Sequence, residues 1–249
     1  MLRELASRVA GGAGLTDQRD AGKQQAALAA VAMVTEGMVV GLGTGSTAAF
    51  AIDGLIARVR DGLHIVGIPT SERSAKQARD GGIELTDFQH HRRIDLTIDG
   101  ADEIAEGSLD LIKGLGGALL REKIVAAASD RLVIIADGPK LVASLGGRVP
   151  VPVEVVPFGW ETTAARLANL GSRPVLRTAA DGAVFRTDGN NLILDCHFGE
   201  IADPARLEQA LSNTVGVIET GLFIGMAATV LVATPEGIHR FDRRLDREG

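Results

Sequence analysis

Acidic side chains gather directly after a short apolar run in the middle of the chain. The run Ile94 to Ile98 is followed by Asp99, Asp102 and Glu103. We interpret this run as a buried strand, so the first carboxylate should emerge at its C-terminal end, where open α/β sheets bind their ligands. Two carboxylates in one environment usually differ in pKa, which lets one accept a proton while the other holds or donates one. The spacing therefore predicts acid–base chemistry.

The same acids could also bind a divalent metal. That reading needs further hard oxygen ligands or histidines. The five histidines of the chain show no ligand spacing such as H-x-x-x-H. We therefore expect no metal and no cofactor. A purely structural alternative stays open, in which Asp99 caps a turn while Asp102 and Glu103 are solvated.

A lysine, three glycines and a charged helix come next along the chain. Lys113-Gly114-Leu115-Gly116-Gly117 is followed by Arg121-Glu122-Lys123. The Lys113 ammonium could stabilise developing negative charge, and the Glu122 carboxylate could move a proton. Glu122 is thus the best candidate for a base, although the Arg-Glu-Lys run is also typical of an ordinary solvated helix face.

A glycine-rich segment, Gly41-Leu42-Gly43-Thr44-Gly45-Ser46-Thr47, lies between a predicted strand and a predicted helix. Glycines expose successive N–H groups, and a helix N-terminus adds partial positive charge, so the segment predicts an anion-binding loop with hydroxyl donors from Ser46 and Thr47. It matches the dinucleotide pattern G-x-G-x-x-A, but Pro69-Thr70-Ser71 stands where that site needs an acid. It also lacks the Gly-Lys-Ser/Thr of a Walker loop. The plain alternative is a turn with a serine helix cap.

A further polar segment, Ala136-Asp137-Gly138-Pro139-Lys140, follows another apolar strand. Lys140 could pair with a phosphate or hydroxyl, although lysines beyond turns are commonly just solvated. The loops after four predicted parallel strands should emerge at one edge of the sheet, which brings an anion loop, hydroxyls, acids and lysines together. We interpret this convergence as one site. Cys196 and His197 are expected to lie away from it.

Short apolar runs alternate with helical patterns through the first 136 residues. The predicted helices cover residues 23–36, 46–60, 71–79 and 116–129, and the predicted strands cover 38–42, 64–68, 94–98 and 131–136. This alternation predicts an α/β fold with a mostly parallel sheet that helices cover on both faces.

The pattern changes near Pro150-Val151-Pro152. We predict strand 151–156, helix 160–170, strand 175–178 or 183–186, strand 191–196, helix 203–213 and strand 215–220. This is the β-α-β-β-α-β order of a ferredoxin-like unit. Two last strands, 229–233 and 238–241, should return to the first sheet as a hairpin. The expected domains are residues 1–148 plus 221–249, and a smaller inserted domain over 149–220.

The composition narrows the classes of partner. The net charge of the 249 residues is -6 without a Lys/Arg run, so no nucleic acid is expected. The single cysteine, Cys196, excludes an intrachain disulfide, and the N-terminus lacks the pattern of a secretory signal. Every apolar run is too short to span a bilayer. We therefore expect a cytoplasmic protein without a membrane partner.

The segments GLGTGST, DGADE, KGLGGALLREK and ADGPK, in this order and followed by PVEVVP, closely resemble the A-type ribose-5-phosphate isomerases over about residues 23 to 241. The resemblance implies a Rossmann-like domain with a smaller α/β domain, a pentose phosphate substrate, no metal, and a homodimer or homotetramer. It implies Glu122 as the base, Asp99 and Asp102 in ring opening and hydroxyl proton transfer, and Lys113 as the stabiliser of charge. The implied substrate contacts are Lys23, Thr44, Gly45, Ser46, Thr47, Asp99, Gly100, Ala101, Asp102, Lys113, Gly114, Leu115, Gly116 and Lys140.

One residue departs from the family pattern. Leu115 stands where many relatives have glycine. If this position needs a positive φ, the loop must be built differently; if its φ is negative, nothing is lost.

Two alternatives from other classes stay open. A sugar-phosphate effector domain of a repressor would need a DNA-binding module, for which the residues before Lys23 are too few, and it would not need Glu122. A coenzyme A transferase relative would use a glutamate as nucleophile, and the DGADE loop argues against it.

Overall fold

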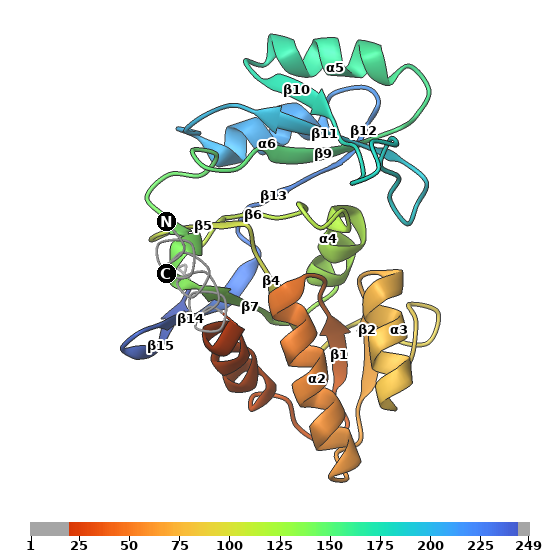
Figure 1. The fold of residues 1–249 in the computed structure, drawn as a ribbon, viewed down its shortest axis with the longest axis vertical. Coiled ribbons are helices and arrows are strands. Elements are labelled where there is room, and N and C mark those ends of the chain that lie inside the picture. The colour runs from red at the N-terminus through yellow and green to blue at the C-terminus, as the bar shows by residue number, and fades with distance from the viewer. Residues whose placement is uncertain (1–19, 244–249) are drawn as a thin grey trace, which may run out of the picture.

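The computed structural model describes residues 20–243, which form three sheets and the helices around them (Figure 1). The large sheet has seven strands in the order β15-β14-β7-β4-β1-β2-β3. These strands are β1 (Val39–Leu42), β2 (Val66–Pro69), β3 (Glu84–Leu85), β4 (Leu96–Gly100), β7 (Leu132–Asp137), β14 (Ala227–Thr234) and β15 (Gly237–Asp242). Only β15 pairs antiparallel, as the second strand of a hairpin with β14. The mostly parallel sheet and its C-terminal hairpin are confirmed.

Helices cover both faces of the large sheet. The helix over residues 20–31 packs on one face together with α2 (Ser46–Arg60) and α3 (Glu72–Gly81), and α4 (Leu119–Ala127) packs on the other. The chain leaves β1 toward β2 on one side, while β4 lies on the other, so the strand order reverses between β1 and β4. Ligands of open α/β sheets bind at such a reversal.

The first helix ends at residue 31 rather than at residue 36 as predicted. Arg58 of α2 donates from Nη1 to the carbonyls of Val31 and Val34, at 2.8 and 2.6 Å. The last carbonyls of a helix have no hydrogen-bond partner within the helix. By donating to them, Arg58 stabilises the end of this helix at residue 31. Gly37, with φ 77°, then turns the chain into β1.

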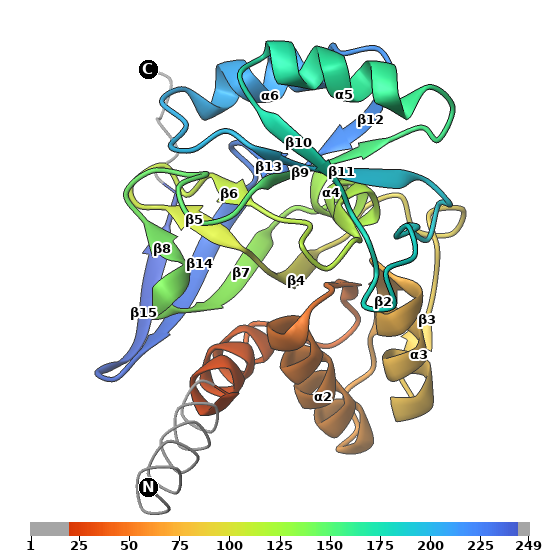
Figure 2. The ribbon, with the colours of Figure 1, turned by 45° about the horizontal axis from the view of Figure 1, so that its top comes forward.

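The small sheet has the order β10-β11-β9-β12, and all its pairs are antiparallel. Its elements are β9 (Val151–Val155), α5 (Trp160–Asn169), β10 (Arg173–Leu176), β11 (Leu192–His197), α6 (Pro204–Ser212) and β12 (Val217–Thr220). Both helices cover the same face (Figure 2). The ferredoxin-like order is confirmed, with the second strand over 173–176, whereas 183–186 lies in the β10–β11 loop. The domain limits at 149 and 220 stay a prediction.

A third sheet, which the sequence did not predict, lies between the other two (Figures 1 and 2). Its order is β13-β6-β5-β8, with β5 (Glu103–Ala105), β6 (Leu111–Ile112), β8 (Leu141–Val142) and β13 (Leu222–Phe223). Ile104, Leu111 and Phe223 pack against the large sheet, while Ile112 and Leu222 pack against the small one. Strands of two or three residues are too short to show a periodic pattern.

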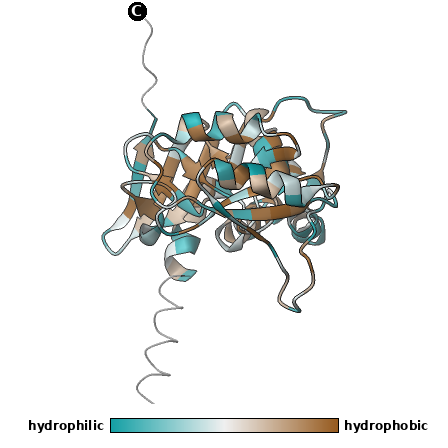
Figure 3. Ribbon diagram, turned by 90° about the horizontal axis from the view of Figure 1, so that it is seen from above, coloured by the Kyte–Doolittle hydropathy of each residue, from teal (hydrophilic) through white to brown (hydrophobic). Residues whose placement is uncertain are grey.

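The apolar residues concentrate in the strands, and the exposed sides of the helices are hydrophilic (Figure 3). Within residues 20–243, no helix is long and apolar enough to cross a membrane.

Candidate active site

A cavity of about 250 Å³ opens where the loops after β1 and β4 meet. It is lined by Lys23, Thr44, Gly45, Ser46, Thr47, Gly100, Ala101, Asp102, Lys113, Gly114, Gly116, Glu122, Asp137 and Lys140. All of the predicted site residues except Asp99 and Leu115 line this cavity. Asp99 lies directly behind the lining, 2.9 Å from Lys113.

The loop after β1 approaches β4 closely because it is built from glycines. A Cβ on Gly43 would lie 2.3 Å from Asp99 Oδ1, so only glycine fits there. Gly45, with φ 122°, is the N-cap of α2, and no side chain caps this helix. The serine-cap alternative is therefore wrong, and the first N–H groups of α2 stay available at the cavity wall.

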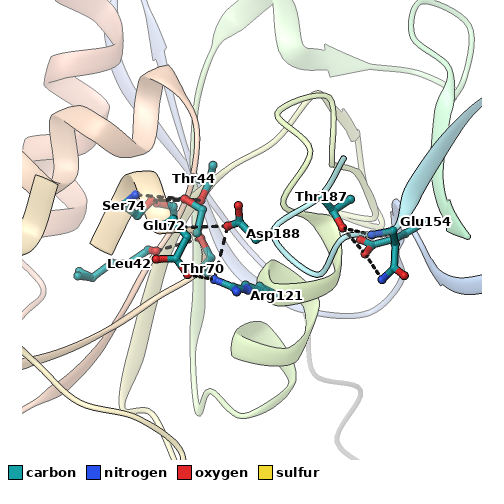
Figure 4. A network of polar contacts seen from close by, with 12 residues as sticks. Leu42, Thr44, Thr70, Glu72, Ser74, Arg121, Glu154, Thr187 and Asp188 are labelled. Atoms are coloured by element: carbon teal, nitrogen blue, oxygen red, sulfur yellow. Dashed lines mark hydrogen bonds and ion pairs between the residues drawn. The ribbon is translucent and has the colours of Figure 1, made fainter. Parts of the chain in front are cut away.

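The hydroxyl of Thr44 is occupied behind this loop. It lies 2.7 Å from the Thr70 hydroxyl, 2.8 Å from that of Ser71 and 3.1 Å from that of Ser74. Ser74 in turn donates to the Gly43 carbonyl at 2.7 Å. Figure 4 shows Thr44, Thr70 and Ser74 side by side. The Thr44 hydroxyl donates its one proton to Ser71, so it has no proton left to donate to a ligand. These buried hydroxyls stabilise the shape of the glycine loop.

Lys113 lies at the centre of a buried charged cluster. Its Nζ is 2.9 Å from Asp99 Oδ2 and 3.3 Å from Glu122 Oε2, and it donates to the Gly100 carbonyl at 2.5 Å. The three charged side chains are at most 4% exposed. The alternatives in which Asp99 caps a turn or Glu122 belongs to a solvated helix face are therefore wrong. Asp99 also accepts hydrogen bonds from the N–H groups of Thr44 and Gly100.

Burial changes the pKa values of this cluster. It raises the pKa of Glu122 to about 8, against the opposing charge of Lys113. It also raises the pKa of the Asp99 carboxyl, which Lys113 and two backbone N–H groups oppose. Burial disfavours the Lys113 ammonium, but the two neighbouring carboxylates outweigh it and hold the lysine pKa above its usual value. Lys113 is therefore a permanent cation, and Glu122 can exchange a proton near neutral pH.

Asp102 and Leu115 meet at the edge of the cavity. The Leu115 N–H donates to Asp102 Oδ2 at 2.9 Å, and the Leu115 side chain is 40% exposed. Among the described residues, only Leu109 and Asn190 combine a side chain with a positive φ. Leu115 thus has a negative φ, and the departure from glycine leaves the loop intact. The positive φ values belong to Gly114 and Gly117.

Glu103, a candidate in the acidic run, has a different role. It is buried in β5 and accepts hydrogen bonds from the backbone N–H groups of Gly146, Arg148 and Val149. The prediction that it is a site acid or a solvated side chain is wrong, because its carboxylate stabilises the loop before β9.

Asp137, which sequence reasoning missed, lines the cavity at the end of β7. Its Oδ1 is buried and has no hydrogen-bond partner among residues 20–243. Like Asp99 in β4, it ends a buried parallel strand on the ligand edge, and this shared position is the signal that could have found it. Lys23 and Lys140 line the same cavity, and Lys23 lies 3.3 Å from Asp20.

No three His, Cys, Asp or Glu side chains in the described part of the chain are placed to hold a metal ion. The expectation of a reaction without metal or cofactor stays a prediction.

The sequence is similar to those of one family of known enzymes. Residues 66–237 match the family model of ribose 5-phosphate isomerase A (phosphoriboisomerase A). Ribose-5-phosphate isomerase A of Gloeobacter violaceus is 62% identical over 216 residues, 87% of this chain and 94% of the relative. Ribose-5-phosphate isomerase A of Gluconobacter oxydans is 59% identical over 221 residues, which cover 88% of this chain and 96% of the relative.

Solved structures show the same likeness. Ribose 5-phosphate isomerase A of Methanocaldococcus jannaschii superposes with a TM-score of 0.86 at 38% identity, covering 89% of this chain and 98% of the other. A D-ribose-5-phosphate isomerase in complex with phospho-erythronic acid gives a TM-score of 0.88 at 36% identity, covering 90% and 99%. The chain therefore belongs to the ribose-5-phosphate isomerase A family, which interconverts ribose 5-phosphate and ribulose 5-phosphate.

Proposed function

We propose that Glu122 is the base of this isomerisation. The observation that carries the proposal is its buried Oε2, which has no hydrogen-bond partner among the described residues and lies 3.3 Å from Lys113 at the cavity. In the open-chain aldose, the carboxylate removes the proton from C2, a C1–C2 double bond forms, and the aldehyde oxygen gains negative charge. Glu122 then returns the proton to C1, and the proton of the O2 hydroxyl moves to O1, which gives the ketose with a C2 carbonyl and a C1 hydroxyl.

The enediolate formed in this step needs a cation. Lys113 supplies it, because its ammonium is buried and held between two carboxylates. Preorganised charge acts most strongly in a site that excludes water. Asp99 does not line the cavity, so we assign it the positioning of Lys113. Asp102 does line the cavity and is proposed for ring opening and hydroxyl proton transfer.

A pH profile tests the assignment of Glu122. Because only the ionised carboxylate accepts a proton and burial raises its pKa to about 8, kcat/KM should fall as the pH drops below that value and level off above it. The slope should approach one decade per pH unit, roughly as a single ionisation requires. A profile that is flat between neutral pH and about 9 would contradict the proposal.

We propose that the substrate phosphate binds between Lys23, Lys140 and the N-terminus of α2, where Ser46 and Thr47 lie. Lys23, Lys140 and the first residues of α2 all line the cavity, and no side chain caps the N-terminus of that helix, which can therefore bind an anion. The phosphate then anchors the sugar, and the opposite end of the chain faces Glu122.

Lys140→Ala is expected to raise KM for ribose 5-phosphate about tenfold or more, because hydrogen bonds to charged groups are worth roughly 1.5–3 kcal/mol. The change in kcat should be smaller, since the phosphate is remote from the reacting carbons. Steady-state kinetics measures both values. Lys76→Ala is the matched control, because Lys76 is exposed and its ion-pair partner among residues 20–243 is Asp80, away from the cavity. An unchanged KM in Lys140→Ala would place the phosphate elsewhere.

We also propose a homodimer or homotetramer. Phe158 is 95% exposed and Val215 is 74% exposed. The Val156 N–H donates to the Gly216 carbonyl, so these apolar side chains come from adjoining segments. A contiguous apolar surface favours association with another chain. Light scattering of the purified protein would contradict this proposal if it gave the mass of one chain.

We also propose that the chain forms two domains. The larger covers residues 1–148 plus 221–249, and the smaller covers residues 149–220. This division is supported by the third sheet, which receives β8 before the first limit and β13 after the second.

We propose the cytoplasm as the compartment, which the single, buried Cys196 supports and cell fractionation would test.

A further inference from the structure

The loop from Gly114 to Gly117 connects two residues of the site, Lys113 and the helix that carries Glu122. It contributes Gly114 and Gly116 to the cavity wall. Gly114 and Gly117 have φ values of 108° and 84°. A loop of this kind can turn its peptide groups in several directions, since glycine adopts many conformations. Whatever fixes those peptides decides which N–H groups face the cavity.

Arg177, which follows β10 in the small sheet, holds two of these peptides. Its Nη1 donates to the carbonyls of Gly114 and Leu115 at 2.8 and 3.1 Å. Its Nε donates to Asp195 Oδ2 at 2.9 Å, and its Nη2 donates to the other oxygen of that carboxylate. The Arg177 side chain is only 11% exposed. The guanidinium is a rigid planar fork, so the carboxylate of β11 fixes the direction of Nη1.

The direction of each carbonyl determines the direction of the next N–H. In a trans peptide these two groups point to opposite sides, and the described residues contain no cis peptide bond. The first peptide shows the consequence, because the Gly114 carbonyl faces Arg177 while the Leu115 N–H faces Asp102 at 2.9 Å. In the second peptide, the Leu115 carbonyl faces Arg177, so the Gly116 N–H points away from it. No acceptor for this N–H occurs within residues 20–243.

We propose that Arg177 is a positioning residue of the isomerase, which holds the Gly116 N–H toward the cavity as a donor to the charged oxygen of the enediolate. The proposal rests on the site proposed around Glu122 and Lys113. It assigns the small sheet a part in the reaction, since Arg177 and Asp195 both belong to that sheet or its loop.

The loop between β10 and β11 is itself held in place. The ring of Phe185 lies 5.9 Å from the Arg177 guanidinium and fills the space beside Gly117, where a Cβ would meet it at 2.4 Å. Further along, Asp188 accepts from the Glu72 N–H at 2.9 Å and lies 3.5 Å from Arg121 Nη1 (Figure 4).

The base of the same loop is bound by a buried acid. Glu154 of β9 accepts hydrogen bonds from Thr187 and Asn191, both at 2.9 Å (Figure 4). Arg177 thus projects from a segment that is fixed at α3, at α4 and at β9. A fixed segment of this kind can hold the 114–117 loop in one conformation, which preorganised donors require.

Arg177→Ala is expected to lower kcat by roughly 10- to 1,000-fold, the range seen when one donor to a developing oxyanion is lost or misplaced. KM for ribose 5-phosphate and the inhibition constant of inorganic phosphate should change by less than about threefold, because the phosphate contacts lie at the other end of the cavity. Added guanidinium chloride at millimolar concentration should restore part of kcat. Arg186→Ala is the matched control, since Arg186 is exposed on the same loop and, in the described part of the chain, its side chain donates to the Asn190 carbonyl alone.

A kcat of Arg177→Ala within about twofold of the unmodified enzyme would overturn the proposal. The proposal would also be overturned if kcat fell, KM rose by the same factor and guanidinium chloride restored no activity. That pattern indicates general damage to the fold. If Arg177→Ala does not fold, Asp195→Asn is the second variant. It retains the arginine but removes the carboxylate that holds the guanidinium in place. An unchanged kcat in Asp195→Asn would overturn the proposal as well. All readouts are ratios to the unmodified enzyme, so they stay valid if a residue other than Glu122 is the base.

Discussion

Glu122→Gln is expected to lower kcat for ribose 5-phosphate by about 100- to 10,000-fold, the usual contribution of a positioned acid–base group. Glutamine fills the same space beside Lys113 but cannot accept the proton from C2. The side chain is 4% exposed, so water has little room to replace it. Coupled assays of ribulose 5-phosphate formation measure the loss.

The same variant should still bind its ligands. We expect the dissociation constant of ribose 5-phosphate to change by less than about threefold, because the substitution leaves the proposed phosphate and hydroxyl contacts in place. Glu161→Gln, on the exposed first turn of α5, is the matched control and should retain full activity. Activity of Glu122→Gln near that of the control would exclude Glu122 as the base.

Lys113→Met is expected to lower kcat by roughly 100- to 1,000-fold, because the enediolate loses its cation. It should also lower the free energy of unfolding at neutral pH by about 3–5 kcal/mol, since two buried carboxylates lose their partner. Without the lysine, the native state binds protons to these carboxyls more tightly than the unfolded chain does. The deficit should therefore shrink as the pH is lowered and grow as it rises. Denaturant titrations at two pH values measure it.

Lys123→Met provides the comparison for Lys113. Lys123 lies over the same Phe223 ring as Lys113, at 5.0 Å from its centroid, but pairs with Glu219 rather than with the site acids. It is partly exposed, so its loss should cost about 1 kcal/mol or less and leave kcat nearly unchanged. Equal losses of activity in the two variants would contradict the special role of Lys113.

Much of the site could be predicted because its residues follow long buried strands. Four of the predicted strands end at one edge of the sheet, and the glycine loop, the acidic run and Lys140 follow three of them. The parallel sheet thus converts positions far apart in sequence into one cavity. Membership in the isomerase family also decides against the effector-domain and coenzyme A transferase alternatives.

The rest depended on contacts that have no local signature. Glu103 stands beside Asp102 in an acidic run, yet it bonds three N–H groups more than forty residues away. Arg177 reaches carbonyls 62 and 63 residues earlier in the chain. The third sheet is assembled from strands of two or three residues that come from separate parts of the sequence. Such pairings are determined by tertiary packing rather than by local pattern.

Isotope exchange at C2 tests the central claim, that Glu122 moves the proton, most directly. Ribose 5-phosphate carrying deuterium at C2 is incubated with the unmodified enzyme or with Glu122→Gln, and NMR follows the label. The unmodified enzyme should move the deuterium to C1 or release it to water in step with turnover. Glu122→Gln should leave it at C2 while still binding ribose 5-phosphate. Loss of the C2 deuterium from Glu122→Gln at the rate of the unmodified enzyme would show that another group removes the proton.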